Sequence, residues 1–132
     1  MSAEPLLTDL DRRTIAVSKA LAADAVEKAG SGHPGTPISL ASVAWLLYQR
    51  EMVHDPLDPG WLGRDRFVLS IGHASLMQYI QLFLAGYDID LSGFTAFRSP
   101  AGLPGHSEFG EVAGVETTTG PLGAGFANAV GL

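Results

Sequence analysis

Apolar residues recur at helical spacing near the start of the chain. These positions are Ile15, Ala22, Val26 and Ala29. The stretch Thr8-Asp9-Leu10-Asp11 just before them has the hydroxyl and the acid of a capping box, and Gly30 stands where a left-handed C-terminal cap is expected. The pattern therefore predicts an amphipathic helix over Asp9–Ala29.

A second helical pattern follows the loop at residues 31–35. Thr36 and Pro37 are a typical N-cap and first-turn pair, which predicts a helix over residues 37–50. Apolar residues lie on almost every side of this helix. Since such a helix is stable only when it is covered all round, we expect it to be buried within a larger body.

The middle and end of the chain alternate loops with short apolar runs. Residues 54–66 and 99–114 are rich in Gly, Pro and Asp and are predicted to be loops. Phe67-Val68-Leu69 predicts a buried strand, and an apolar helix that ends at Gly86 follows it. A short helix is predicted over residues 91–97, and a last one from Pro121 onward.

These elements do not add up to a closed domain. Two nearly all-apolar helices need a covering layer, but one predicted strand makes no sheet. We therefore expect residues 1–132 to be an incomplete N-terminal domain of a bigger fold.

Composition narrows the class of protein. The 132 residues are 46% hydrophobic and 17% charged, which indicates a globular interior. The net charge is −6, and from Tyr87 onward Arg98 is the only base, so no nucleic-acid partner is expected. The absence of cysteine excludes disulfides and thiolate chemistry.

Targeting features are also missing from the sequence. The first residues show no basic region followed by an apolar run, so no signal peptide is expected. The longest apolar stretch, residues 38–48, is too short to span a bilayer, so no membrane partner is expected. We expect a cytoplasmic protein.

Three of the four histidines directly follow a glycine. They are His33 in SGHPG, His73 in IGHAS and His106 in PGHSE. Glycine lets a ligand approach the backbone closely, helix N-termini attract anions, and imidazole titrates near neutral pH. Three such sites together favour a polyanionic ligand, such as a diphosphate or a sugar phosphate, surrounded by imidazoles.

Plainer interpretations stand beside this one. A single histidine of this kind is more often a structural residue. No pair has zinc-site spacing, so no metal ligands are expected in this chain. Gly123-Ala124-Gly125 is a weak dinucleotide pattern, because Asn128 replaces the third glycine. Arg98 is either a phosphate contact or an ordinary surface base.

Longer motifs in fixed order resemble the N-terminal region of transketolase. They are SGHPGTP, DRFVLSIGHAS and LPGHSEFGEVAGVETTTGPLGAGFANAVG, and the match runs from about Leu10 to the last residue. The resemblance implies an α/β, three-layer fold that binds thiamine diphosphate and Mg²⁺, and it implies a homodimer. This fragment would be mostly helical. The reaction it implies transfers a two-carbon ketol unit from a ketose phosphate to an aldose phosphate, within the pentose phosphate pathway.

The resemblance also implies roles for individual residues. His33 and His106 would contact substrate and act as catalytic groups, and His73 would lie beside the cofactor diphosphate and the substrate. Arg98 would bind the sugar phosphate. The cofactor rings would be touched by Gly120, Pro121 and Leu122. Imidazoles with a pKa near neutrality suit the proton transfers that carbon–carbon cleavage needs.

Some family features are changed or lie elsewhere. Ile71 replaces an asparagine, Ser107 replaces a proline, and the stretch from Arg98 to His106 is one residue short. The resemblance places the metal motif, Gly-Asp-Gly with a later asparagine, beyond Leu132, and the activating glutamate in the next domain. We therefore expect the isolated chain to be inactive and to need the rest of the enzyme or a partner subunit.

Two other functions stay open at this point. One is a non-catalytic, truncated module that binds a partner through exposed apolar helices. The other is a free-standing module that binds sugar phosphate without thiamine diphosphate.

Overall fold

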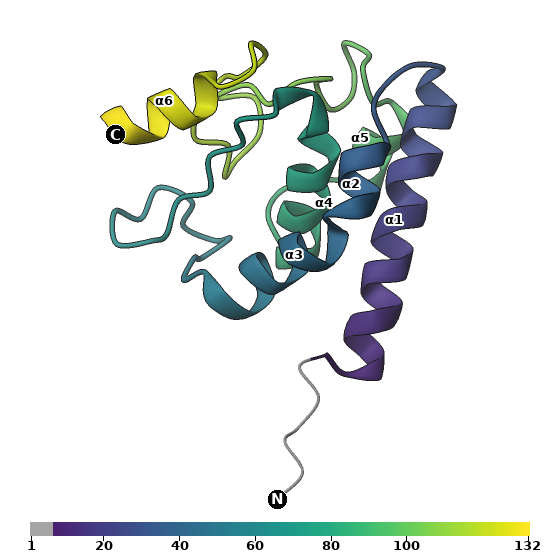
Figure 1. The fold of residues 1–132 in the computed structure, drawn as a ribbon, viewed down its shortest axis with the longest axis horizontal. Helices are drawn as coiled ribbons and strands as arrows, with labels where there is room; N and C mark the ends of the chain where they lie inside the picture. The colour runs from purple at the N-terminus through teal and green to yellow at the C-terminus, as the bar shows by residue number, and fades with distance from the viewer. Residues whose placement is uncertain (1–6) are drawn as a thin grey trace, which may run out of the picture.

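The computed structural model describes residues 7–132 and is built of helices and loops (Figure 1). The elements in chain order are α1 (Asp9–Ala29), α2 (Gly35–Ser39), α3 (Ala41–Leu46), the π-helical turn η1 (Leu47–Glu51), the 3₁₀ turn η2 (Gly72–Ala74), α4 (Ser75–Ala85), α5 (Leu91–Thr95) and α6 (Ala124–Gly131). Helix α1 runs along one side, α2 to α4 pack beside it, and α6 lies on the opposite side (Figure 1). The expectation of a mostly helical fragment is confirmed.

Helix α1 has the predicted bounds and the predicted cap. The Asp11 N–H donates to the Thr8 hydroxyl at 3.2 Å, and the Thr8 N–H donates to the Asp11 carboxylate at 2.8 Å. Arg50 from η1 adds a 2.8 Å ion pair to the same carboxylate. The hydrogen bond from the Thr8 backbone, with help from Arg50, holds the pKa of Asp11 below its usual range. The cap therefore also ties α1 to η1.

The prediction of one helix over residues 37–50 is wrong in where the helix starts and in its being continuous. It begins at Gly35 rather than after Thr36, and Pro37 lies inside the first turn, where backbone N–H groups lack helical partners anyway. The backbone leaves helical geometry at Leu40, with φ −98° and ψ 7°, and the chain ends this region in the π-helical turn η1.

Within residues 7–132 this region is covered on one face, and its burial by a larger body stays a prediction. Leu40 and Val43 are exposed, whereas Ala41, Ala44 and Tyr48 form the buried face. The region is therefore covered on one side, as in an ordinary amphipathic helix.

The predicted strand at residues 67–69 does not form within the described part of the chain. Leu69 is buried as expected and packs with Ala44 and Met77. A strand, however, needs the backbone groups of a neighbouring strand, and residues 7–132 include no such strand. Two further bounds differ from expectation: α5 ends at Thr95, and α6 begins at Ala124, after Gly123 with φ 89°.

Helix α4 forms the centre of the core. Every residue from Ser75 to Leu82 is buried, polar ones included. Tyr79 and Leu82 pack in one cluster with Ala22 of α1 and Phe94 of α5. The helix ends at Gly86, which takes the left-handed conformation with φ 92°. Because α4 is covered on all sides, the loops around it are positioned relative to one rigid element.

The covered surroundings of α4 predict unequal costs for two glycine substitutions. Gly114 and Gly110 both have φ +87°, but a Cβ at Gly114 would lie 2.5 Å from Leu82 Cδ2 and one at Gly110 meets nothing within 4 Å. Each Ala variant strains the backbone by about 1 kcal/mol, and Gly114→Ala adds about 1–3 kcal/mol of overpacking. Urea unfolding of the two variants measures the difference. Equal losses of stability would contradict this packing.

Candidate functional site

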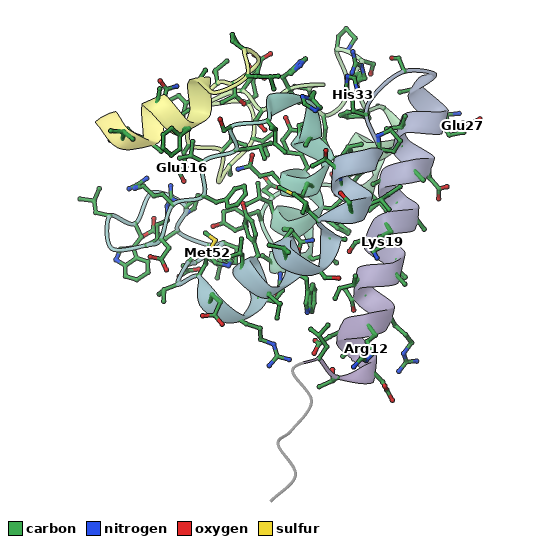
Figure 2. The ribbon with its side chains drawn as sticks, viewed as in Figure 1. Arg12, Lys19, Glu27, His33, Met52 and Glu116 are labelled. Atoms are coloured by element: carbon green, nitrogen blue, oxygen red, sulfur yellow. The ribbon has the colours of Figure 1, made fainter. Side chains whose placement is uncertain are left out.

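Two of the three glycine-linked histidines lie against each other. The ring centroids of His33 and His73 are 4.9 Å apart, with an interplanar angle of 69°. His73 lies in η2, directly before α4, and His33 lies in the loop after α1, near the end of that helix (Figure 2). Gly32 turns this loop with φ +140°, and a Cβ there would lie 3.0 Å from Val26 Cγ2. The loop therefore returns close to α1 and presents His33 to His73.

The loop that holds His106 is attached to one face of α4. Three hydrogen bonds of 3.0 Å join them: Ser75 to the Gly105 carbonyl, Tyr79 to the His106 carbonyl, and Ser107 to the Gln78 side chain. Residues three and four apart share a helix face, so the three α4 side chains act together. Burial raises the pKa of Tyr79, which keeps its hydroxyl protonated as a donor.

The segment at residues 119–126 lies against the stretch that leads into His73. A Cβ at Gly72 would lie 2.8 Å from the Thr119 carbonyl, and a Cβ at Gly125 would lie 2.6 Å from the Leu69 carbonyl. The Thr119 N–H also donates to the Ser107 carbonyl at 2.9 Å. These contacts join the Gly120 loop both to η2 and to the loop that holds His106.

Part of the backbone and side chains at this junction is open to the surface. A Cβ at Gly120 would meet nothing within 4 Å, and Pro121 and Leu122 are exposed. The Thr119 hydroxyl is buried without a hydrogen-bond partner in the described residues. The open backbone at Gly120 and the exposed side chains of Pro121 and Leu122 therefore lie next to the turn that carries His73.

Arg98 and His106 line one pocket of about 500 Å³. Arg98 is the one residue other than glycine with positive φ, 65°, in the described part of the chain. Its N–H donates to the Leu103 carbonyl at 2.9 Å, which holds this conformation. Its side chain lies over Gly105, where a Cβ would be 3.3 Å from Arg98 Cγ. Such strain is typical of functional positions.

An ionic cluster centred on Glu116 was not predicted from the sequence. Glu116 pairs with Arg64 through one oxygen and with Arg66 through the other, the latter at 2.9 Å. Glu116 raises the pKa of Arg64, and both side chains are buried. Figure 2 shows Glu116 on the side of the molecule that carries α6. Arg66 and Arg64 are 50 and 52 positions from Glu116 in sequence, so no local pattern could have revealed the cluster.

Metal clusters and membrane-spanning helices are the two remaining features to consider in residues 7–132. There the His, Asp and Glu side chains form no group of three or more that could hold a metal ion. The helices of this region lack the length and apolarity needed to cross a membrane.

Comparison with known proteins gives the class of this chain. A family model described as the transketolase, thiamine diphosphate binding domain matches residues 10–132. The chain therefore belongs to the transketolase thiamine diphosphate binding domain family. This confirms the resemblance drawn from the histidine and glycine motifs.

Particular relatives are transketolases. The chain is 55% identical over 126 residues to transketolase from Mycobacterium bovis, covering 95% of this chain and 18% of that protein. It is 58% identical over 113 residues to the chromosomal transketolase of Cupriavidus necator, covering 85% and 17%. A Pichia stipitis transketolase structure, a complex with sedoheptulose-7-phosphate, matches with a TM-score of 0.90 at 45% identity, covering 94% and 18%.

These matches show the fold class of the chain and how much of each relative it spans. The expected α/β fold of the family is confirmed, with this chain as a helical part of it. The chain spans less than a fifth of the length of the curated relatives it matches.

The contact between Gly72 and Thr119 predicts a local effect of substitution. Gly72→Ala should push the 119–122 segment away from His73, because a Cβ 2.8 Å from a carbonyl cannot be accommodated. Amide hydrogen exchange at Thr119, whose N–H is bonded to Ser107, should speed up at least about tenfold. Gly120→Ala is the control, since its Cβ meets nothing. Unchanged protection of Thr119 in Gly72→Ala would contradict the contact.

Proposed function

We propose that this chain is the N-terminal part of a transketolase. Such an enzyme transfers a two-carbon ketol unit from a ketose phosphate to an aldose phosphate. The observation that carries the proposal is the arrangement around α4, where η2 places His73 against His33 and the helix face holds the loop of His106. Residues 1–132 would form an incomplete diphosphate-binding domain, with the remaining domain and activity supplied by the rest of the enzyme.

The cofactor would lie at the junction of η2 and the Gly120 loop. His73 and the N-terminus of α4 suit the diphosphate, and Gly120, Pro121 and Leu122 suit the rings. Thiamine diphosphate, when bound, supplies the carbanion-stabilising chemistry that side chains lack. The Mg²⁺ ligands would come from the part of the enzyme beyond this chain.

The histidines and Arg98 would act on the sugars. His33 and His106 would take a proton from the hydroxyl next to the breaking carbon–carbon bond and return one to the acceptor oxygen. His73 would add hydrogen bonds to substrate hydroxyls, and Arg98 would bind the sugar phosphate. Two Pichia stipitis structures support this substrate class, since they are named as complexes with sedoheptulose-7-phosphate and fructose-6-phosphate.

The family resemblance supports two further features of the complete enzyme. One is a homodimer, in which each cofactor lies between subunits. The other is a cytoplasmic location, as the sequence led us to expect.

Exposed apolar side chains favour a second candidate, the non-catalytic interaction module. Phe109, Phe126 and Val130 are each more than two-thirds exposed, by 69%, 73% and 76%. Apolar surface of this kind is typical of contact sites. The histidine variants below separate the two functions, because an interaction module does not need imidazoles.

Substitution of a proposed catalytic histidine should slow ketol transfer. In the complete enzyme, His106→Ala should lower kcat with xylulose 5-phosphate and ribose 5-phosphate by about 10²–10⁴-fold, because a proton-transfer group is lost. His54→Gln is the matched control, since His54 contacts the Tyr48 carbonyl and Tyr87 outside the site. Steady-state kinetics measures both variants. Full ketol transfer in His106→Ala would contradict the catalytic role of His106. A complete protein that lacks ketol transfer, and whose biological role survives His33→Ala and His106→Ala, would be the non-catalytic module.

The isolated chain should show no ketol transfer at all. Residues 7–132 present no metal-ligand cluster, and the proposed metal motif and activating glutamate belong to the rest of the enzyme. The assay uses purified residues 1–132 with thiamine diphosphate, Mg²⁺ and the same two sugar phosphates. Turnover by this chain alone would show that ketol transfer does not need the rest of the enzyme, which contradicts the proposal.

A further inference from the structure

Glu116 joins two arginines that lie far from it in the sequence. One carboxylate oxygen accepts a hydrogen bond from Arg64, and the other accepts one from Arg66 at 2.9 Å. The Glu116 side chain is 5% exposed and that of Arg64 is 8% exposed. Arg64 in turn donates through Nε to the Pro59 carbonyl at 2.6 Å. Because each oxygen is bound by a different arginine, the carboxylate is held in one orientation by charge-assisted bonds, which are stronger than neutral ones.

The two stretches of chain that this carboxylate joins both lead to the proposed cofactor site. Arg66 starts the stretch that ends in η2, and Glu116 starts the one that leads to the Gly120 loop. The two stretches meet a second time where Gly72 packs against Thr119, since a Cβ at Gly72 would lie 2.8 Å from the Thr119 carbonyl. The ion pair therefore fixes one end of a junction whose other end is the contact within η2.

The stretch that Glu116 starts is also bonded to residues 107–109. The Phe109 N–H donates to the Thr118 hydroxyl at 3.0 Å, and the Thr119 N–H donates to the Ser107 carbonyl at 2.9 Å. Consecutive residues of this stretch thus contact both loops that carry site histidines. The place of Glu116 therefore bears on how these loops and the junction fit together.

We propose that Glu116 is a positioning residue for thiamine diphosphate, because its bonds to two arginines set the Gly120 loop against η2 and so set the affinity for the cofactor. The proposal rests on the proposed function, since it takes this junction as the cofactor site. Glu116 would act through the two stretches that it joins. A purely structural ion pair would stabilise the fold and leave cofactor affinity unchanged, so affinity separates the two roles.

Arg66 is the better residue to change, because its loss leaves Glu116 paired with Arg64. Removal of Glu116 would instead leave two guanidinium groups without their carboxylate, and breaking a buried pair in this way is strongly destabilising. Arg66→Gln removes the ion pair to one oxygen, whereas Arg66→Lys keeps a positive charge and a donor for it. The two variants therefore differ in whether the charged bond can form.

The dissociation constant of thiamine diphosphate is measured by titration calorimetry, with Mg²⁺ in excess, for the complete enzyme and its variants. Arg66→Gln should weaken binding about three- to tenfold, because one bond that fixes the junction is lost. Arg66→Lys should stay within about twofold of the unchanged enzyme. Without cofactor, amide hydrogen exchange at Thr119 should be at least about threefold faster in Arg66→Gln.

Arg50→Gln is the matched control. Arg50 pairs with Asp11 at 2.8 Å, and the Asp11 side chain is 8% exposed. As at Glu116, the carboxylate keeps a second partner when the arginine is removed, here the Thr8 N–H. This pair lies at the start of α1, so its loss should change the dissociation constant of thiamine diphosphate by less than about twofold and leave exchange at Thr119 unchanged.

The outcomes separate this proposal from the proposed function. An unchanged dissociation constant or unchanged exchange in Arg66→Gln, or equal weakening by Arg50→Gln or Arg66→Lys, would overturn the role of Glu116, and ketol transfer by the same samples would leave the proposed function standing. A complete enzyme that binds no thiamine diphosphate would contradict both. Weaker cofactor binding in Arg66→Gln alone, in an enzyme without ketol transfer, would support the positioning role and contradict the transketolase function.

Discussion

The structure depends on how the buried helix α4 satisfies its polar side chains. In a helix that is covered from Ser75 to Leu82, each hydroxyl or amide left without a partner costs about 1–3 kcal/mol, and within residues 7–132 Gln81 Oε1 is one such group. Ser75, Gln78 and Tyr79 find their partners in residues 105–107. The bonds that satisfy these polar side chains of α4 are therefore the same bonds that fix the loop of His106.

The glycine before each site histidine has a common physical role. A Cβ would lie 3.0 Å from Val26 at Gly32, 2.8 Å from Thr119 at Gly72, and 3.3 Å from Arg98 at Gly105. Each glycine therefore permits another segment to pack directly against the backbone, and the histidine that follows is carried to the junction. The repeated Gly-His pairs thus reflect close packing of loops as well as room for a ligand.

Local features could be predicted from the sequence, and features that need distant partners could not. Helix α1 follows from its capping box and periodicity, and the helix that ends at Gly86 follows from its apolar run. The strand expected at residues 67–69 failed because strand pairing depends on a second segment. The sequence pointed to His33, His73 and His106 as a group, and the structure brings His33 to His73 and places His106 with Arg98. The pairing of Glu116 with Arg64 and Arg66 spans a separation that periodicity does not detect.

The attachment of the His106 loop to α4 has a consequence for folding order. Its three hydrogen bonds join residues 27, 30 and 29 positions apart, and the Arg66–Glu116 pair joins residues 50 apart. Closing such loops costs chain entropy, whereas the cap of α1 forms within three residues. The helices can therefore form before the loops are in place, and the loops are the first part to open again. A sample can show full helical circular dichroism while its histidines are still unassembled, so helix content does not report an intact site.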